Sequence, residues 1–177
     1  MVGFAEAAAY LEVIAERAEA AAEPVAIAMA EAFTDHVSEV TLRQTAHDRW
    51  SKTPAPETGP PSYVSGHLAD SFVVIPGGGG GGTGRAIAGN TAIYAAVQQF
   101  GAIIRVKTRK FLMWKTDYPT KATSFWKSER EGDGLYLNFA KEVRIPDRDY
   151  WARGLVEAEG EIEEKKIATF MALVWGE

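Results

Sequence analysis

Residues 2–47 form a run in which Ala, Glu, Leu and Arg dominate, and a run of that length and composition favours helix over strand. Pro24 interrupts the run. Because proline lacks an amide proton and its ring clashes with the preceding turn, we expect either a kink there or a break into two helices. Residues 1–47 are therefore predicted to be a helical N-terminal region.

The apolar side of this region changes along its length. The first half carries a narrow stripe that is mostly alanine, so packing alone buries little apolar area there. The second half has larger apolar residues at helical spacing. The weak first stripe leaves two interpretations open, contact with a neighbouring subunit or a solvated helix that frays. The two stripes are Phe4, Ala7 or Ala8, Leu11, Ile14 and Ala18, and then Met29, Phe33, Val37 and Val40.

Two loops and a strand are predicted next. Residues 48–66 hold four of the eight prolines, which is typical of an extended loop. A short turn then leads into an apolar segment, residues 72–75, where we expect a strand. Residues 76–90 begin with a proline and six consecutive glycines and are predicted to be a glycine-rich loop.

A short helix that ends in a sharp turn is predicted over residues 94–101. Asn90 or Thr91 can cap its start. Gly101 lies where the chain must turn into a left-handed conformation, which glycine adopts without steric cost. The apolar side of this helix consists of Ile93, Tyr94, Val97 and Phe100.

An antiparallel meander is predicted after this helix. Residues 117–127 form a loop or an irregular strand between its hairpins, and residues 131–134 form one hairpin turn. The expected strands are residues 102–106, 110–114, 135–139 and 142–145.

A long amphipathic helix is predicted to end the chain. Asp147 or Asp149 is expected to cap its start. Together the elements predict a single α+β domain over residues 1–177, with an antiparallel sheet of about four to five strands packed with a long N-terminal helix, a short middle helix and a C-terminal helix. The apolar stripe of the last helix is Trp151, Leu155, Ala158, Ile162, Phe170 and Val174.

The charge and the cysteine count exclude several classes of function. A net charge of −5 argues against a general nucleic-acid binder, which needs clustered Lys and Arg. It is compatible with an acidic lining past which DNA slides. The chain has no cysteine, which excludes disulfides and zinc-thiolate sites and fits a reducing cytosol. Its Ala- and Glu-rich start predicts neither a signal peptide nor a membrane span.

No stretch of the sequence predicts a catalytic or cofactor-binding site. The glycine run continues as Thr83-Gly84-Arg85, without the Gly-Lys-Ser/Thr of a phosphate-binding loop, so a hairpin tip or a disordered insert is favoured. A second candidate cluster contains the residue types of a hydrolytic triad, but proximity in sequence does not identify a triad, and a hydrogen-bonded turn is favoured. The cluster is Ser65, His67, Asp70 and Ser71.

No metal site is predicted either. His36 and His47 have no acidic or histidine partner at ligand spacing.

The acidic residues of the last helix point to several sides, so a solvated face is favoured over a glycosidase carboxylate pair. These residues are Glu157, Glu159, Glu161, Glu163 and Glu164.

One patch of the sequence is both basic and aromatic. Alternation along a strand would place Arg105, Lys107 and Arg109 on one face. They fit contact with DNA or an acidic partner, or a charged solvent face of a sheet, and the acidic total favours the solvent face. Three tryptophans fit either a core or anchors at a subunit boundary. They are Trp114, Trp126 and Trp151.

Several short motifs follow the N-terminal helix and the proline-rich stretch. Gly66-His-Leu-Ala-Asp-Ser71 is a Gly-x-Leu-x-x-Ser element, and residues 94–101 have the pattern Tyr-Ala-x-x-Gln-x-Phe-Gly. A Phe-Leu-x-Trp strand follows at residues 111–114, and Ile-Pro-x-Arg-x-aromatic follows at residues 145–150. Over residues 25–174 this order resembles the neck and tail-completion proteins of tailed bacteriophages, the head–tail joining family that includes virion-morphogenesis proteins of Mu-like phages.

The resemblance implies a mechanical role in the virion. Members are small α+β subunits that form a ring, usually hexameric, between the portal side of the head and the tail tube. The implied partners are further copies of the chain and the neighbouring neck, connector and tail-tube proteins. DNA passes through the lumen without sequence-specific binding, and no membrane, cofactor or enzymatic activity is involved. The implied location is the neck or tail of the virion, after assembly in the host cytoplasm.

The resemblance also assigns roles to residues. Phe100 and Gly101 fix the turn from helix to sheet, and Ile145 and Pro146 set the entry to the C-terminal helix. Arg148 would pair with a carboxylate across a subunit boundary, since its planar fork suits a bidentate contact. The six-glycine insert and the Tyr150-Trp151 pair depart from the family pattern. The candidate subunit or partner contacts are Arg148, Tyr150, Trp151, Trp114, Trp126, Arg105, Lys107 and Arg109.

Two alternatives remain open. A small nucleic-acid-binding module using residues 105–110 predicts salt-sensitive DNA binding by the isolated monomer. A small hydrolase using the acidic helix or the turn at Ser65 and His67 predicts a deep pocket with perturbed ionisable groups.

Overall fold

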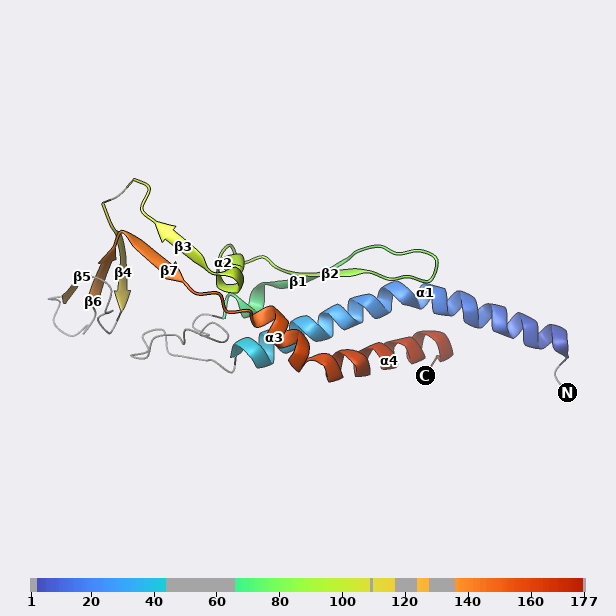
Figure 1. The fold of residues 1–177 in the computed structure, drawn as a ribbon. Coiled ribbons are helices and arrows are strands. Elements are labelled where there is room, and N and C mark those ends of the chain that lie inside the picture. The colour runs from blue at the N-terminus through green and yellow to red at the C-terminus, as the bar shows by residue number, and fades with distance from the viewer. Residues whose placement is uncertain (1–2, 44–65, 109, 117–123, 128–135, 177) are drawn as a thin grey trace.

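The longest element is a 33-residue helix, α1 (Phe4–His36), and the other elements lie along it or beyond its C-terminal end (Figure 1). The computed structural model describes residues 3–43, 66–108, 110–116, 124–127 and 136–176. The predicted α+β class is confirmed. The proline-rich loop predicted at 48–66 lies almost entirely outside the described residues.

The helix α1 continues through Pro24 instead of breaking there. Its axis bends near the middle of its length (Figure 1), as expected where a proline removes one backbone hydrogen bond. A π-helical turn, Val37–Leu42, extends it at the C-terminal end. Of the two outcomes predicted at Pro24, the kink is the one that occurs.

A β-hairpin lies along α1. Strands β1 (Phe72–Pro76) and β2 (Ala86–Asn90) pair antiparallel, and the glycine run forms the connection between them. The predicted glycine-rich loop at 76–90 is therefore wrong for Pro76, which ends β1, and for its last five residues, which form β2. Its Ala-Ile-Ala-Gly-Asn sequence has little strand propensity, and pairing with β1 makes it a strand. Near the tip, a Cβ on Gly84 would overlap the backbone of Ala22, so the hairpin lies against the helix backbone itself.

The remaining strands form two separate ladders, so the predicted single sheet of four to five strands is wrong for the described residues. The ladders are β3 (Ala102–Arg105) with β7 (Glu142–Ile145), and β4 (Leu112–Thr116), β6 (Tyr136–Ala140) and β5 (Ser124–Lys127) in that order. Lys141 alone separates β6 from β7, and a nearly continuous strand therefore joins the two ladders. Because β3 pairs with β7, the three-stranded ladder lies between them in the sequence, and the predicted meander does not form.

The C-terminal region is two helices, where one was predicted. These are α3 (Tyr150–Glu157) and α4 (Glu159–Trp175), with the change of direction at Ala158, and α4 packs antiparallel to α1 (Figure 1). In α3 the buried row starts one residue earlier than predicted. Tyr150 and Gly154 are buried in place of Trp151 and Leu155, because this row faces the π-helical turn. Ile162 and Val174 are buried as predicted, whereas Phe170 is exposed.

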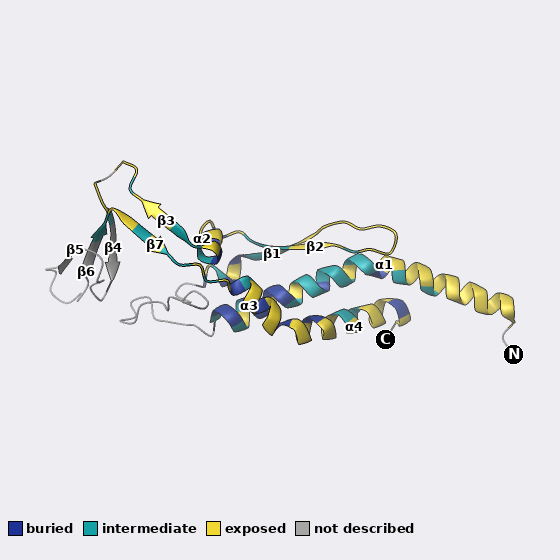
Figure 2. Ribbon diagram, in the orientation of Figure 1, coloured by how far each residue is buried: buried dark blue, intermediate teal, exposed yellow. Residues whose placement is uncertain are grey.

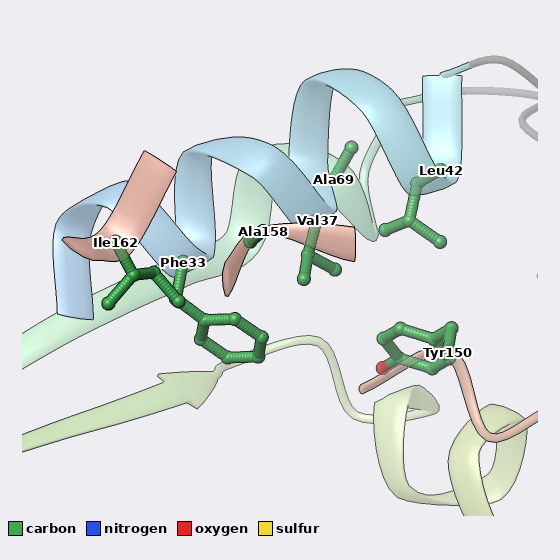
Figure 3. Close-up of a cluster of buried hydrophobic side chains, with 7 residues drawn as sticks. All are labelled: Phe33, Val37, Leu42, Ala69, Tyr150, Ala158 and Ile162. Atoms are coloured by element: carbon green, nitrogen blue, oxygen red, sulfur yellow. The ribbon is translucent and has the colours of Figure 1, made fainter. Parts of the chain in front are cut away.

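The core lies where α1, the π-helical turn, α3 and the start of α4 meet (Figure 3). A 3₁₀ turn, Ala69–Ser71, closes it from the side of the hairpin. Away from this junction, the N-terminal part of α1 and the far end of the hairpin are mostly exposed (Figure 2). Buried residues recur where α1 and α4 pack together, at Ala21 and Val174. The buried cluster is Phe33, Val37, Leu42, Ala69, Tyr150, Ala158 and Ile162.

Candidate assembly interface

A buried glutamine holds the short middle helix, α2 (Ala95–Phe100), against the start of α3. Gln99 Nε2 donates to Asp149 Oδ1 at 2.8 Å, and Gln99 Oε1 accepts from the Trp151 amide at 3.1 Å. The Gln99 carbonyl also accepts from the amides of Arg148 and Asp149, each at 3.4 Å. Asp149 has a left-handed backbone, with φ of 41°. The polar side chain of α2 thus fixes a strained turn.

The orientation of α2 differs from the prediction. Ala95 and Gln99 face inward, while Ile93 is 99% exposed and Phe100 is 77% exposed. Ile93 and Phe100 of the predicted apolar face therefore point outward, while the Tyr94 ring lies against His67 and Val97 is half-buried. The two side-chain hydrogen bonds of Gln99 favour this orientation over the packing of one short apolar stripe. The sequence motif singled out Gln98, but Gln99 makes the contacts. The sequence does not show which of these two neighbouring glutamines faces α3, because that depends on how α2 is oriented in the fold.

Gly101 makes the turn from α2 into β3, as predicted. Its φ of 69° and ψ of 169° belong to a region open almost only to glycine. A Cβ there would lie 2.8 Å from the Asp147 amide nitrogen and 2.9 Å from the Ile145 carbonyl oxygen. Two distant motif stretches, 94–101 and 145–150, therefore meet at this glycine.

Two open grooves flank this junction. The first, with a volume of about 820 Å³, lies beside Phe100, Ile103, Arg144 and Pro146. The second, of about 480 Å³, lies between α2 and the start of α3 and includes Gln99 and Trp151. Phe100 lines both. The residues that carry the family resemblance thus line concave surfaces, which are suited to contact with another chain.

The structure places Tyr150 and Trp151 inside the fold. Tyr150 is fully buried, and this removes it from the candidate interface. The Trp151 ring lies 5.3 Å from that of Phe33 and 5.6 Å from that of Phe72, measured between centroids. Of the two interpretations of Trp151, the core residue is the one that the structure supports.

Tyr150→Phe is expected to raise the free energy of unfolding by about 1 kcal/mol. The Tyr150 hydroxyl has no hydrogen-bond partner among the described residues, so removing it ends a desolvation cost. Burial raises its pKa above the ordinary value of 10.0; a weak interaction with Trp151, short of hydrogen-bond geometry, partly opposes this, and Tyr94 adds to it.

The raised pKa adds a pH dependence to this prediction. The unfolded chain loses the proton first, so wild-type stability falls as pH rises above 10.0 towards the folded pKa. The Phe variant has no such loss, so the difference in unfolding free energy between the two proteins should widen in this alkaline range. Urea unfolding at neutral and alkaline pH measures both effects, and a Phe variant less stable than wild type at neutral pH would show that the hydroxyl has a partner.

Arg148 lies in the turn that Gln99 holds. Its side chain is half-buried, and burial lowers the pKa of the guanidinium. Its backbone amide donates to Gln99, so the residue helps to define the turn. Pairing of Arg148 with a carboxylate of another subunit stays a prediction.

The remaining candidate residues lie around the two outer ladders. Arg105 ends β3 and its Nε is 2.7 Å from Glu142 Oε2, while Lys107 is exposed beyond the strand. The strand does not continue through Lys107, so the predicted alternation on one face does not hold. Trp114 lies in β4 and Trp126 in β5, with Asn138 and Leu137 as their neighbours in β6. Arg109 lies outside the described residues.

Apolar side chains near the N- and C-terminal ends of the chain are exposed in the described structure. Residues 4–16 of α1 project past the end of α4, where Arg17 donates to the Val174 carbonyl. We call residues 4–16 the acidic overhang, since it has three glutamates and no Lys or Arg. Phe4 is 99% exposed and Leu11 64% exposed, so this part of the predicted stripe is uncovered. The last turns of α4 also expose Ile167, Leu173 and Trp175.

A buried histidine connects α1 to the C-terminal helices. His36 Nδ1 lies 3.1 Å from Glu161 Oε1, and Nε2 lies 3.8 Å from Glu157 Oε2, although neither approach has hydrogen-bond geometry. Thr41 donates to the same Glu157 oxygen at 3.2 Å. Glu157 and Glu161, predicted to be solvated, therefore also face the α1 packing. Sequence spacing could not reveal this, because more than 100 positions separate the partners.

Within the described residues, no group of three or more His, Asp or Glu side chains is placed to hold a metal ion. His47 and Ser65 lie outside that part of the chain. The rest of the Ser-His-Asp cluster forms the predicted hydrogen-bonded turn, with Ser71 Oγ donating to the His67 carbonyl and Asp70 Oδ1 lying 2.8 Å from Arg43 Nη2. None of the described helices has both the length and the apolar character that crossing a bilayer requires.

Comparison with known proteins returns no match, whether the chain is set against protein-family models, curated proteins or solved structures. Inference about function therefore depends on the geometry described above and on the order of motifs in the sequence.

Proposed function

We propose that the chain is a structural protein of a tailed bacteriophage that forms a ring at the head–tail interface. It would act as a neck, tail-completion or tail-terminator protein, joining tail to head and leaving a channel for DNA. The motif order supports this family, and the two grooves formed by those motifs support a role in docking. The role is mechanical and uses no catalytic residue.

The observation that carries the proposal is the set of large apolar side chains that stay exposed in the described part of the chain. They include Phe4 and Leu11 in α1, Phe100 at the end of α2 and Ile103 in β3. Contiguous exposed apolar surface on a folded chain marks sites of contact with other chains. A chain with such residues on several elements suits a subunit that is completed by its neighbours.

The exposed apolar residues are distributed as a ring subunit requires. They occur on both sides of the helical core of an elongated chain, and an isologous dimer would cover only one patch. The second candidate function, a nucleic-acid-binding module, is favoured by the exposed cations around β3. Several of these lie beside exposed isoleucines, which a phosphate backbone would leave uncovered.

Light scattering across a concentration series, together with negative-stain images, tests the ring. We expect a mass that corresponds to a closed oligomer, hexameric in the simplest case, and particles with a central channel. A mass that stays monomeric, together with tight, salt-sensitive binding of duplex DNA, would contradict the ring and support the nucleic-acid module.

A further inference from the structure

Two surfaces on opposite sides of the helical core carry opposite charge. On one side is the acidic overhang, whose Glu6, Glu12 and Glu16 are all exposed. On the other side (Figure 1), between the core and the three-stranded sheet, are β3, β7 and their described flanking residues up to 111 and from 140, which we call the basic ribbon. The basic ribbon has one acidic residue, Glu142, and five exposed basic residues. The basic residues are Arg105, Lys107, Lys110, Lys141 and Arg144.

One face of the basic ribbon combines charge with an apolar centre. The register places Ile103 opposite Arg144, and Arg105 opposite Glu142, so these four residues share a face. Ile103 is 50% exposed. Arg105 is already neutralised by Glu142, whereas no ion pair within the described chain involves Arg144 or Lys107. The first groove lies at the foot of this face, and its lining includes Phe100, Ile103 and Arg144 together with one acidic residue, Asp147.

The acidic overhang has the complementary pattern. Phe4 and Leu11 are two helical turns apart and lie in one strip, which is the spacing of anchors for a helix in a groove. Glu12 and Glu16 are one turn apart and lie in a neighbouring strip. A helix with an apolar strip beside an acidic strip matches a groove whose apolar wall lies beside Arg144, with the other exposed cations of the basic ribbon further along the strands.

We infer that the acidic overhang of one copy docks in the groove beside the basic ribbon of a second copy. The two surfaces lie on opposite sides of the helical core of the same chain, so the contact is head-to-tail and repeats from copy to copy. Only the closure of this series into a ring rests on the proposed function. Pairing of two overhangs would leave the ribbon cations without acidic partners and would bring the glutamates of the two overhangs together. DNA on the ribbon would leave the apolar strip of the overhang uncovered.

Reciprocal charge reversal tests the contact. Glu12→Lys with Glu16→Lys reverses the overhang, and Lys107→Glu with Arg144→Glu reverses the ribbon. Each double variant alone should associate at least about tenfold more weakly than wild type at low salt, measured by sedimentation velocity. An equimolar mixture of the two double variants should recover association, because every junction in an alternating series then pairs opposite charges. All four substitutions in one chain should restore it as well.

Matched variants separate the contact from net charge. Glu31→Lys with Asp35→Lys makes the same charge change at the same spacing on an exposed part of α1, and should associate as wild type does. Arg85→Glu with Lys165→Glu is the corresponding control for the ribbon. Circular dichroism confirms that each variant is folded, which is expected because all of these side chains are exposed.

Several outcomes would overturn the contact. These are a wild-type chain that stays monomeric at every concentration in low salt, reversed variants that associate like wild type, or a mixture that recovers nothing. Loss of duplex-DNA binding by the ribbon variant, with association unchanged, would assign the ribbon to nucleic acid instead. Rings that persist in images of both reversed variants would overturn the contact and leave the proposed function standing. Open filaments that never close into rings, and that are lost in the charge-reversed variants, would support the contact and overturn the proposed function.

Discussion

Replacing Gly101 with alanine is expected to lower the free energy of unfolding by about 3 kcal/mol or more. Its backbone lies in a region that side chains rarely enter, with φ of 69° and ψ of 169°. The new Cβ would also lie under 3.0 Å from two backbone atoms of the 145–147 turn, and backbone cannot move aside as a flexible side chain can. Because this turn joins α2, the basic ribbon and α3, the damage should reach the core.

Urea unfolding followed by tryptophan fluorescence measures this change. Gly160→Ala is the matched control, since a Cβ at Gly160 meets nothing within 4 Å and the residue lies inside α4. That substitution should stabilise the protein by up to about 1 kcal/mol, from helix propensity alone. A Gly101→Ala protein as stable as wild type would show that the turn is not held as described.

Gln99→Leu is expected to cost about 2–3 kcal/mol. The side chain is 9% exposed and spans the gap between α2 and α3, accepting from the Trp151 amide and donating to Asp149. Leucine fills a similar volume, but its side chain can neither accept a hydrogen bond from the Trp151 amide nor donate one to Asp149. The left-handed backbone of Asp149 then loses the hydrogen bond that helps to hold it.

The neighbouring residue provides the control for this prediction. Gln98→Leu makes the same chemical change one position away, where the side chain is only half-buried and makes no hydrogen bond to α3 within the described structure. Its unfolding free energy should stay within about 0.5 kcal/mol of wild type. Equal losses at the two positions would contradict the specific role of Gln99.

Elements with strong local signals could be predicted from the sequence. The long helix, the kink at Pro24, the turn at Gly101 and the positions of most strands follow from propensity, proline chemistry and spacing. The strand β2 was missed, because its small residues become a strand only through pairing with β1. The pairing of β3 with β7 was also missed, since residues 37–43 positions apart carry no local sign of contact.

The candidate site was harder to predict than the fold. The resemblance counts Tyr150 and Trp151 among the candidate interface residues, and residue type alone leaves Trp151 open between core and subunit boundary; in the structure Tyr150 belongs to the core cluster and Trp151 packs against it. Outward-facing Phe100 was expected to pack, because a periodic stripe shows that one side of a helix differs from the other but not which side meets the core. The charge separation between the acidic overhang and the basic ribbon depends on the elongated arrangement of the elements, which the order of charges along the sequence does not specify.

The single residue between β6 and β7 has a mechanical consequence. The three-stranded sheet is attached to the body of the molecule through a two-stranded ribbon, one strand of which passes into the sheet without a loop. Two-stranded ribbons twist more readily than wide sheets. Torsion of this stalk would swing the sheet as a unit while leaving Gly101 and the packed helices undisturbed, so the sheet could reorient without any cost to the core.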